Sequence, residues 1–156
     1  MKRITVMAVL VLGLLTTAFG KARSASGEAR IKQKAPPVVS IDPSSIDFRD
    51  QVTSRASAPR RITVTNKGEK KLYINSAALG GDDVQDFILS SDTCTGASIA
   101  AQKSCIIDIR FNPRRTGSKR AALTLTDNAG DSPQKVTLSG NGINSVDEQQ
   151  GASTAR

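Results

Sequence analysis

The 156-residue sequence contains no histidine and no tryptophan, and it has one tyrosine and four phenylalanines. Histidine is the usual base of a Ser or Cys catalytic triad, so its absence removes the commonest arrangement for covalent hydrolysis. No Gly-rich phosphate loop follows a predicted strand and opens a helix, as nucleotide-binding motifs require. The sequence therefore predicts a protein that is not an enzyme, with no catalytic residues and no cofactor-binding or metal site.

The scarcity of aromatic side chains also narrows the classes of ligand. Single-stranded nucleic acids and the apolar faces of sugars are bound on aromatic rings. Phe19 lies in the apolar N-terminal segment, and the other three phenylalanines occupy expected core positions. Basic pairs such as Arg60-Arg61 and Arg114-Arg115 are therefore interpreted as solvated strand ends that protect sheet edges. No nucleic-acid partner is predicted.

Only one long apolar run occurs in the chain, from Ile4 to Leu15. It follows Lys2 and Arg3 and gives way to small residues up to Gly20, a pattern typical of a secretory signal peptide. The run is too short to span a bilayer comfortably, and no cysteine directly follows it to carry a lipid. We predict that residues 1–20 are a signal peptide, that the protein is exported to the periplasm or beyond, and that no stable transmembrane span remains after processing. An uncleaved membrane anchor is the alternative.

Cysteine is rare too, with Cys94 and Cys105 as the two copies. They lack CxxC spacing, and the chain has no histidine, which argues against a zinc site, a c-type haem site or a thioredoxin-like motif. In an exported chain two cysteines favour a disulfide, because the compartment is oxidising. Their spacing fits the base of one loop between adjacent strands, so we predict a structural Cys94–Cys105 disulfide. Two free redox-active thiols are the alternative.

Charge and composition divide the rest of the chain, whose formal net charge is +8. Residues 21–37 have few large apolar side chains and end in Pro36-Pro37, which predicts a basic flexible linker. Residues 143–156 are predicted to be a disordered tail, and residues 38–142 a folded domain of nearly balanced charge. The cations of the linker are candidate contacts for an anionic surface: Lys21, Arg23, Arg30, Lys32 and Lys34.

Hydrophobic alternation with a period of two runs through the predicted domain. The segment from Cys105 to Phe111 would turn Cys105, Ile107, Ile109 and Phe111 toward one buried face. Similar short runs, separated by turn residues, occur at 38–41, 46–48, 61–65, 72–74, 86–90, 121–126 and 135–139. No segment has a convincing helical period. Seven to eight short strands in about 100 residues predict an all-β fold of two packed sheets.

Acidic residues gather after Gly80-Gly81, at Asp82, Asp83, Asp86 and Asp92. Closely spaced carboxylates are the hard oxygen ligands that Ca²⁺ prefers. Their spacing does not match an EF-hand loop, and solvated turn residues are the favoured interpretation. Whether this loop binds a cation stays open from the sequence.

Several short motifs follow one another in a recognisable order. They are Ile46-Asp47-Phe48, Val64-Thr65-Asn66-Lys67-Gly68, Asp86-Phe87, Cys94-Thr95-Gly96, Ser104-Cys105, Phe111-Asn112-Pro113, Gly117, Ala122-Leu123-Thr124-Leu125-Thr126-Asp127-Asn128 and Leu138-Ser139-Gly140-Asn141-Gly142. Together they resemble the bacterial choice-of-anchor D domain, related to the ASH and hydin-like immunoglobulin-fold modules, over roughly residues 38–142. The resemblance implies an immunoglobulin-like β-sandwich used as a surface or envelope module, with no catalytic residues.

These observations predict an exported, non-catalytic immunoglobulin-like module that acts as a protein-binding or scaffolding domain of the bacterial cell envelope. Its partner would be an envelope or extracellular protein, bound through a sheet face or an exposed strand edge. The alternative is an adhesin-like module that attaches to anionic envelope polymer or lipid through its basic N-terminal arm.

Overall fold

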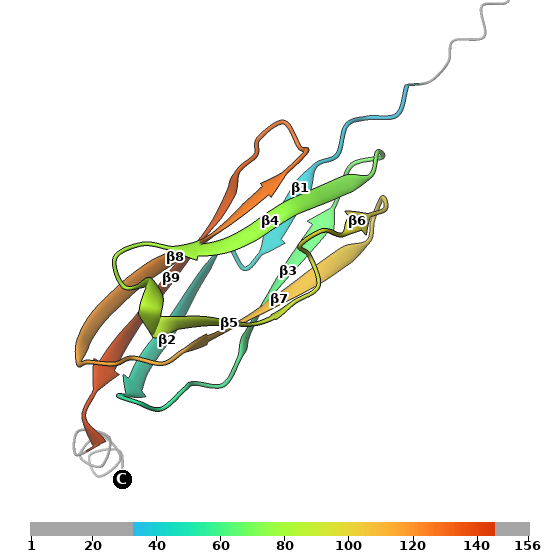
Figure 1. Cartoon of the computed structure of the whole chain (residues 1–156). Helices are drawn as coiled ribbons and strands as arrows, with labels where there is room; N and C mark the ends of the chain where they lie inside the picture. Colours follow the sequence, from blue (N-terminus) through green and yellow to red (C-terminus); the bar gives the residue numbers. More distant parts are fainter. Residues whose placement is uncertain (1–32, 146–156) are drawn as a thin grey trace, which may run out of the picture. The chain divides into compact units, whose positions relative to one another are not determined.

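The computed structural model describes residues 33–145, and the predicted signal peptide lies outside this range. Within it, nine strands and one 3₁₀ turn form two sheets that pack face to face (Figure 1). The elements are β1 (Val39–Asp42), β2 (Ser45–Val52), β3 (Arg60–Asn66), β4 (Leu72–Gly80), η1 (Val84–Asp86), β5 (Phe87–Asp92), β6 (Ser98–Ile99), β7 (Ser104–Phe111), β8 (Gly117–Asp127) and β9 (Gln134–Ile143). In this part of the chain no helix has the length and apolar character needed to cross a membrane.

The all-β immunoglobulin-like sandwich is confirmed, although it has more strands than the seven to eight predicted. The strand missing from the prediction is β6, which is two residues long and so cannot display an alternating pattern. Sheet 1 has the order β1-β3-β7-β5, and sheet 2 has the order β2-β9-β8-β4-β6. Neighbouring strands are antiparallel except for β2 and β9, which are parallel. The chain changes sheets at Pro43-Ser44, between β1 and β2.

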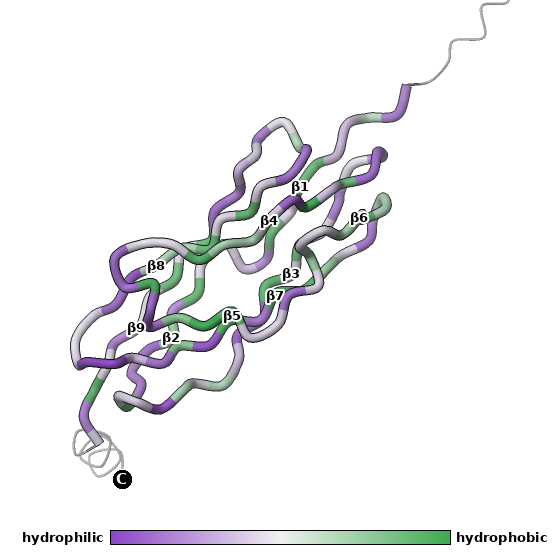
Figure 2. Tube along the Cα trace, in the orientation of Figure 1, coloured by the Kyte–Doolittle hydropathy of each residue, from purple (hydrophilic) through white to green (hydrophobic). Residues whose placement is uncertain are grey.

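The core lies between the sheets and is built from the inward residues of each alternating strand. In β7 the predicted set is confirmed, because Cys105, Ile107, Ile109 and Phe111 are all buried. Figure 2 shows hydrophobic residues recurring along β3, β5, β7 and β8, while several connecting loops are hydrophilic. Further fully buried side chains come from β3, β4, β8 and β9: Ile62, Val64, Leu72, Ile74, Leu123, Leu125, Val136 and Leu138.

Three phenylalanines form the aromatic part of this core. The ring centroid of Phe111 lies 4.9 Å from that of Phe87 and 5.8 Å from that of Phe48. The same Phe111 ring rests against the backbone of Gly140, where an added Cβ would lie 2.5 Å from a ring carbon. Glycine is therefore required at this position by the close approach of an immobilised ring.

The N-terminal boundary of the domain differs from the prediction. The flexible linker was predicted to extend through Pro37, but ordered backbone contacts begin at Ala35. Ala35 N donates to Glu69 Oε2 (2.9 Å), and Lys70 N donates to Ala35 O (3.0 Å). Pro37 is buried, and Gly68 has no Cβ to obstruct the backbone of the two prolines. Proline fixes an extended φ angle, which lowers the entropy cost of laying this segment on the β3–β4 turn.

At the other boundary, β9 includes Ile143, which was assigned to the disordered tail. Ile143 pairs with Val52 of β2, and its carbonyl accepts a hydrogen bond from Thr53 N (2.9 Å). Pairing with β2 therefore extends β9 one residue beyond the last motif predicted from the sequence. Residues 146–156 of the predicted tail lie outside the described range.

Candidate functional site

The predicted disulfide between Cys94 and Cys105 is confirmed, with a Cα–Cα distance of 5.1 Å. Cys94 follows β5, and Cys105 is the second residue of β7, its neighbour in sheet 1. After Cys94 the chain leaves sheet 1 and forms β6, which pairs with Leu72 and Tyr73 of β4 in sheet 2. The disulfide therefore closes the loop that contains β6. Both cysteines are buried. The disulfide is therefore structural, and it links β5 to β7 at the point where the chain passes from sheet 1 to sheet 2.

Asp92 shapes the turn that leads into this disulfide. Its Oδ1 accepts hydrogen bonds from Cys94 N (2.7 Å) and Thr95 N (3.0 Å), and its Oδ2 accepts one from Thr95 Oγ1 (2.6 Å). Burial raises the pKa of Asp92, but the hydrogen bonds from Thr95 and Cys94 together hold that pKa below its ordinary value. Its carboxylate oxygens are thus engaged by protein donors.

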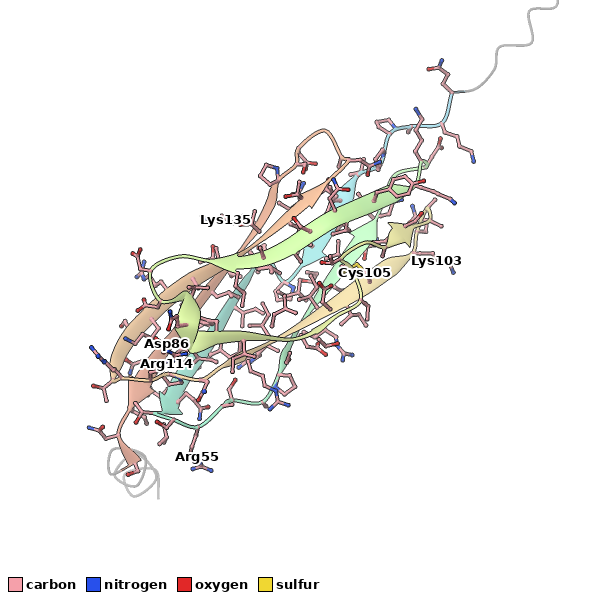
Figure 3. The ribbon with its side chains drawn as sticks, viewed as in Figure 1. Arg55, Asp86, Lys103, Cys105, Arg114 and Lys135 are labelled. Carbon is pink, nitrogen blue, oxygen red and sulfur yellow. A yellow bond between two sulfur atoms is a disulfide. The ribbon has the colours of Figure 1, made fainter. Side chains whose placement is uncertain are left out.

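The other acidic residues of the candidate cation loop tie that loop to β8. Asp86 is buried, and its Oδ1 accepts a hydrogen bond from Arg114 N at 2.8 Å (Figure 3). Asp83 Oδ2 accepts one from Arg120 N (2.9 Å). Lys119 Nζ lies 3.7 Å from Asp83 Oδ1 and 3.8 Å from Asp86 Oδ2, so one amine bridges the two carboxylates and offsets part of their charge. Across residues 33–145 no group of three or more acidic, cysteine or histidine side chains is arranged to hold a metal ion, and Asp82 is exposed to solvent.

The basic pairs interpreted as strand ends make cross-strand and loop contacts. Arg61 Nε donates to Asp108 Oδ1 across β3 and β7 at 2.9 Å, and this hydrogen bond lowers the pKa of Asp108. Arg114 Nη1 donates to Oε1 of Gln85, which is part of η1 (2.6 Å). Both arginines belong to the polar exterior of the sandwich.

The candidate anionic-surface contacts fall mostly outside the described residues. Lys21, Arg23, Arg30 and Lys32 are not described, whereas Lys34 is exposed just before Ala35. The chain after Lys34 meets the β3–β4 turn, and Lys103 O accepts a hydrogen bond from Asn66 N (3.0 Å) at the same end of the sandwich (Figure 3).

This end carries a cluster of amines, which we call the lysine end: Lys34, Lys67, Lys70, Lys71 and Lys103. None of these amines forms an ion pair with another residue of the described chain. The sequence places these cations in separate segments, so only the fold reveals that four of them adjoin the entry point of the basic linker.

The outer face of sheet 2 has a shallow depression of about 400 Å³ that sequence reasoning missed. Its floor consists of small side chains from adjacent strands, where Ala122 of β8 pairs with Thr137 of β9 and Thr124 pairs with Lys135. Arg120 lies on the same face as Ala122 and Thr124, because alternate residues of a strand share a face. We call this surface the small-residue face, lined by Gly80, Gly81, Asp82, Arg120, Ala121, Ala122, Thr124, Lys135 and Thr137.

The cations of the small-residue face lie at its two ends along the strands. Arg120 pairs with Ser139, and Lys135 pairs with Thr124 four residues further along β8. Neither side chain forms an ion pair within residues 33–145. A flat floor with a free cation at each end can receive an extended acidic segment. The only trace of this face in the sequence is the small residues at alternate positions of β8. Such a pattern is also found in ordinary half-buried strands, so it does not by itself indicate a binding face.

Ser132 and Lys135 have the Ser-x-x-Lys spacing found in some serine acyl-transfer enzymes. Ser132 lies in the β8–β9 loop, where its Oγ accepts a hydrogen bond from Asp127 N (2.9 Å). Lys135 lies on the outer face of sheet 2, opposite Thr124. Within residues 33–145 no hydrogen bond joins the Lys135 amine to the Ser132 hydroxyl, as activation of that hydroxyl by an adjacent base would need.

The family comparison covers most of the folded domain. A family model described as HYDIN/CFA65/VesB-like, Ig-like domain matches residues 37–141. This match confirms the hydin-like immunoglobulin-fold part of the resemblance, while the narrower choice-of-anchor D assignment stays a prediction. No curated protein matches the sequence.

Solved structures with the same fold come from distant proteins. A protein of unknown function from Porphyromonas gingivalis W83 is 14% identical, with a TM-score of 0.56 over 67% of this chain and 46% of that one. The VesB protease of Vibrio cholerae is 16% identical, with a TM-score of 0.51 over 66% of this chain and 31% of the protease. The human CEP192 ASH/PapD-like domain 7 is 18% identical, with a TM-score of 0.52 over 78% of this chain and 97% of that domain. The chain thus spans less than half of the two bacterial proteins, and these likenesses concern the fold alone.

Proposed function

The chain belongs to the HYDIN/CFA65/VesB-like family of Ig-like domains, and from this premise we propose that it is an exported, non-catalytic protein-binding module of the bacterial cell envelope. The observation that carries the proposal is the small-residue face, an exposed floor of Ala and Thr side chains with an unpaired cation at each end. The proposal includes the narrower assignment to choice-of-anchor D domains.

The partner of this face is an extended protein segment that carries acidic side chains. A floor without large side chains lets a partner backbone approach sheet 2 closely, and the alternation of a bound strand would direct every second side chain toward it. Arg120 can bind a carboxylate through two parallel hydrogen bonds, and Lys135 supplies a second point charge. Exposed pairs of this kind contribute up to about 1 kcal/mol each, so they select the partner more than they tighten its binding.

Export is supported by the buried disulfide, since disulfides persist in oxidising compartments. The proposal places a cleavage site after Gly20, so that the mature chain begins at Lys21. Mass measurement of the protein isolated from its native host tests this directly. A full-length species held in the membrane would contradict it.

Photo-cross-linking in intact cells tests the binding face. A photoreactive amino acid at Thr137, in the floor of the depression, should give a discrete cross-linked species with one envelope protein. Adding Arg120→Glu and Lys135→Glu should abolish that species. The matched control, Lys70→Glu with Lys103→Glu, makes the same change of charge at the lysine end and should retain it. Equal loss in both double variants would contradict a role for the small-residue face.

The lysine end favours a second candidate function, attachment to anionic envelope polymer or lipid. The basic linker leads into a surface where Lys67, Lys70, Lys71 and Lys103 have no ion-pair partner in residues 33–145. Each such charge near an anionic surface contributes about 1 kcal/mol, and salt screens it. Deleting residues 21–34 should weaken binding to anionic vesicles, and adding Lys70→Glu and Lys103→Glu should weaken it further. Binding that is unchanged by both alterations would contradict this function.

A further inference from the structure

The edge strands of the two sheets are β1, β5, β2 and β6, and the first three are protected against pairing with another chain. β6 has two residues and covers only the start of β4. Proteins protect such edges with short strands, proline, charges or bulges. β1 has four residues and lies between Pro37 and Pro43. β2 is interrupted by a bulge that presents the charged Arg49, whose φ is 59°. β5 is interrupted by a bulge after Leu89, three residues from its start.

The edge of β4 lacks these devices over the segment from Ser76 to Gly80. β6 pairs with β4 at Leu72 and Tyr73, and the adjacent loop bonds to Ile74 through Ala97 O (3.2 Å) and Gly96 N (2.8 Å). Beyond Ile74 no other strand pairs with this edge in the described chain. The segment Ser76-Ala77-Ala78-Leu79-Gly80 contains no charged residue and no proline. A bulge precedes it at Asn75, where it does not interrupt the segment.

The ladder register fixes which backbone groups of this segment point outward. Ile74 lies opposite Asp127 of β8 and directs both its N–H and its C=O away from β8. Ala77 and Leu79 lie opposite Leu125 and Leu123, which follow Asp127 at intervals of two residues. Because backbone groups alternate sides along an antiparallel ladder, Ala77 and Leu79 also direct their N–H and C=O groups away from β8.

The side chains beside these groups leave part of the core uncovered. Ala77 and Leu79 face inward but are only partly buried, and so are Leu89 of β5 and Ala97 of the β5–β6 loop. Ala78, on the outer face, is exposed and small. The β4 edge therefore combines free backbone groups with apolar side chains that a further strand would cover.

We propose that two copies of the chain pair through this edge, antiparallel, about a two-fold axis that passes beside Ala78. In this register Ala77 of each copy pairs with Leu79 of the other, and each such pair exchanges both of its N–H···O bonds. The larger Leu79 side chain meets the smaller Ala77 on the inner face, and Ala78 meets Ala78 on the outer face, so no bulky side chain obstructs the contact.

Charge complementarity identifies a second copy as the occupant. β4 is preceded by Lys70 and Lys71 and followed by Asp82, which is exposed and forms no ion pair within residues 33–145. Antiparallel pairing brings the basic end of each β4 toward the acidic end of the other, and the uncharged middle adds no repulsion. The result is one continuous sheet in which the small-residue faces of both copies lie on the same side. This inference goes beyond the proposed function and does not depend on it.

Sedimentation equilibrium of the purified full chain, with its disulfide formed, measures the association. The wild-type chain should dimerise in a concentration-dependent manner. Ala77→Pro removes an outward N–H without touching the β4–β8 ladder, and it should raise the dissociation constant at least about tenfold. The matched variant Ala77→Val keeps that N–H and should dimerise within about threefold of the wild type. Circular dichroism establishes that each variant is folded.

A cross-linking measurement tests the axis itself. Ala78→Cys should form an intermolecular disulfide under mild oxidation, because the two Ala78 positions face each other. Thr124→Cys, on the same face but one strand further in, should not. The proposal is overturned if the wild-type chain stays monomeric up to roughly 1 mM, if Ala77→Pro dimerises like Ala77→Val, or if the two cysteine variants cross-link equally. If the chain proves to be monomeric, the free edge of β4 would instead be available to a strand from a different protein.

Discussion

At the scale of single residues, Gly140 is constrained by the core. In the sequence it is part of the Gly140-Asn141-Gly142 motif, which suggests a turn rather than a packed position. Gly140→Ala should destabilise the fold by about 1–3 kcal/mol, because the new methyl group collides with the immobilised Phe111 ring. Chemical denaturation monitored by circular dichroism measures the loss. Gly130→Ala is the matched control, since a Cβ there meets nothing within 4 Å. Equal effects of the two substitutions would show that Phe111 moves aside freely.

Asp127 is a second residue whose environment the sequence does not reveal. It is 7% exposed, its Oδ1 accepts a hydrogen bond from Ala129 N (2.7 Å), and its buried Oδ2 has no partner. Burial raises the pKa of Asp127, the hydrogen bond from Ala129 opposes this, and the charge of Asp131 raises it further, so the net direction is upward. The folded state therefore binds this proton more tightly than the unfolded state does.

A raised carboxyl pKa implies a stability contribution that is fully present below the unfolded value of about 3.9 and is lost as pH rises through the folded pKa. Asp127→Asn removes the titration and keeps the acceptor for Ala129. Its melting temperature relative to that of the wild type should rise from pH 4 toward neutrality, because only the wild type loses this contribution as the carboxyl ionises. Asp131→Asn should give a smaller shift of the same sign. A difference that does not change with pH would contradict this assignment.

At the scale of elements, the disulfide acts on β6 more than on the strands that carry its cysteines. β5 and β7 are already paired in sheet 1, whereas β6 has two residues and pairs with β4 alone. Replacing Cys94 and Cys105 together by Ser should lower stability by about 3 kcal/mol, the chain-entropy value for a short loop. Hydrogen exchange should show the largest loss of protection at Ser98 and Ile99. Uniform loss across sheet 1 would indicate that the bond supports the whole sheet instead.

The strands themselves were largely predictable, because a half-buried strand must alternate. β7, β3 and the C-terminal part of β8 follow from that rule, and so does the two-sheet class, whereas the first four residues of β8 were not predicted. The rest depends on contacts between distant segments. Nothing in Pro36-Pro37 indicates that they lie on the turn at Gly68, and the small-residue face arises only when β8 and β9 align Ala122 with Thr137. The disulfide was predictable as a pair, but its position at the crossing between sheets was not.

At the scale of the whole domain, the parallel pairing of β2 with β9 has a mechanical consequence. The described chain enters the sandwich at the β1 end and leaves it beyond Ile143, at the opposite end (Figure 1). A pull on both ends would draw β2 and β9 in opposite directions along their length, over the register from Ser45–Thr137 to Val52–Ile143. All the ladder hydrogen bonds would then resist sliding together, whereas a sideways pull would open them one after another.

Single-molecule stretching should therefore find a direction-dependent resistance. Tethers attached at Lys34 and Asn144 should require a clearly higher force than tethers at Lys34 and Lys103, which both lie at the same end of the sandwich. Equal forces in the two directions would mean that the β2–β9 ladder does not govern mechanical opening. The β2–β9 ladder would then set the tension that the described domain withstands between its two ends.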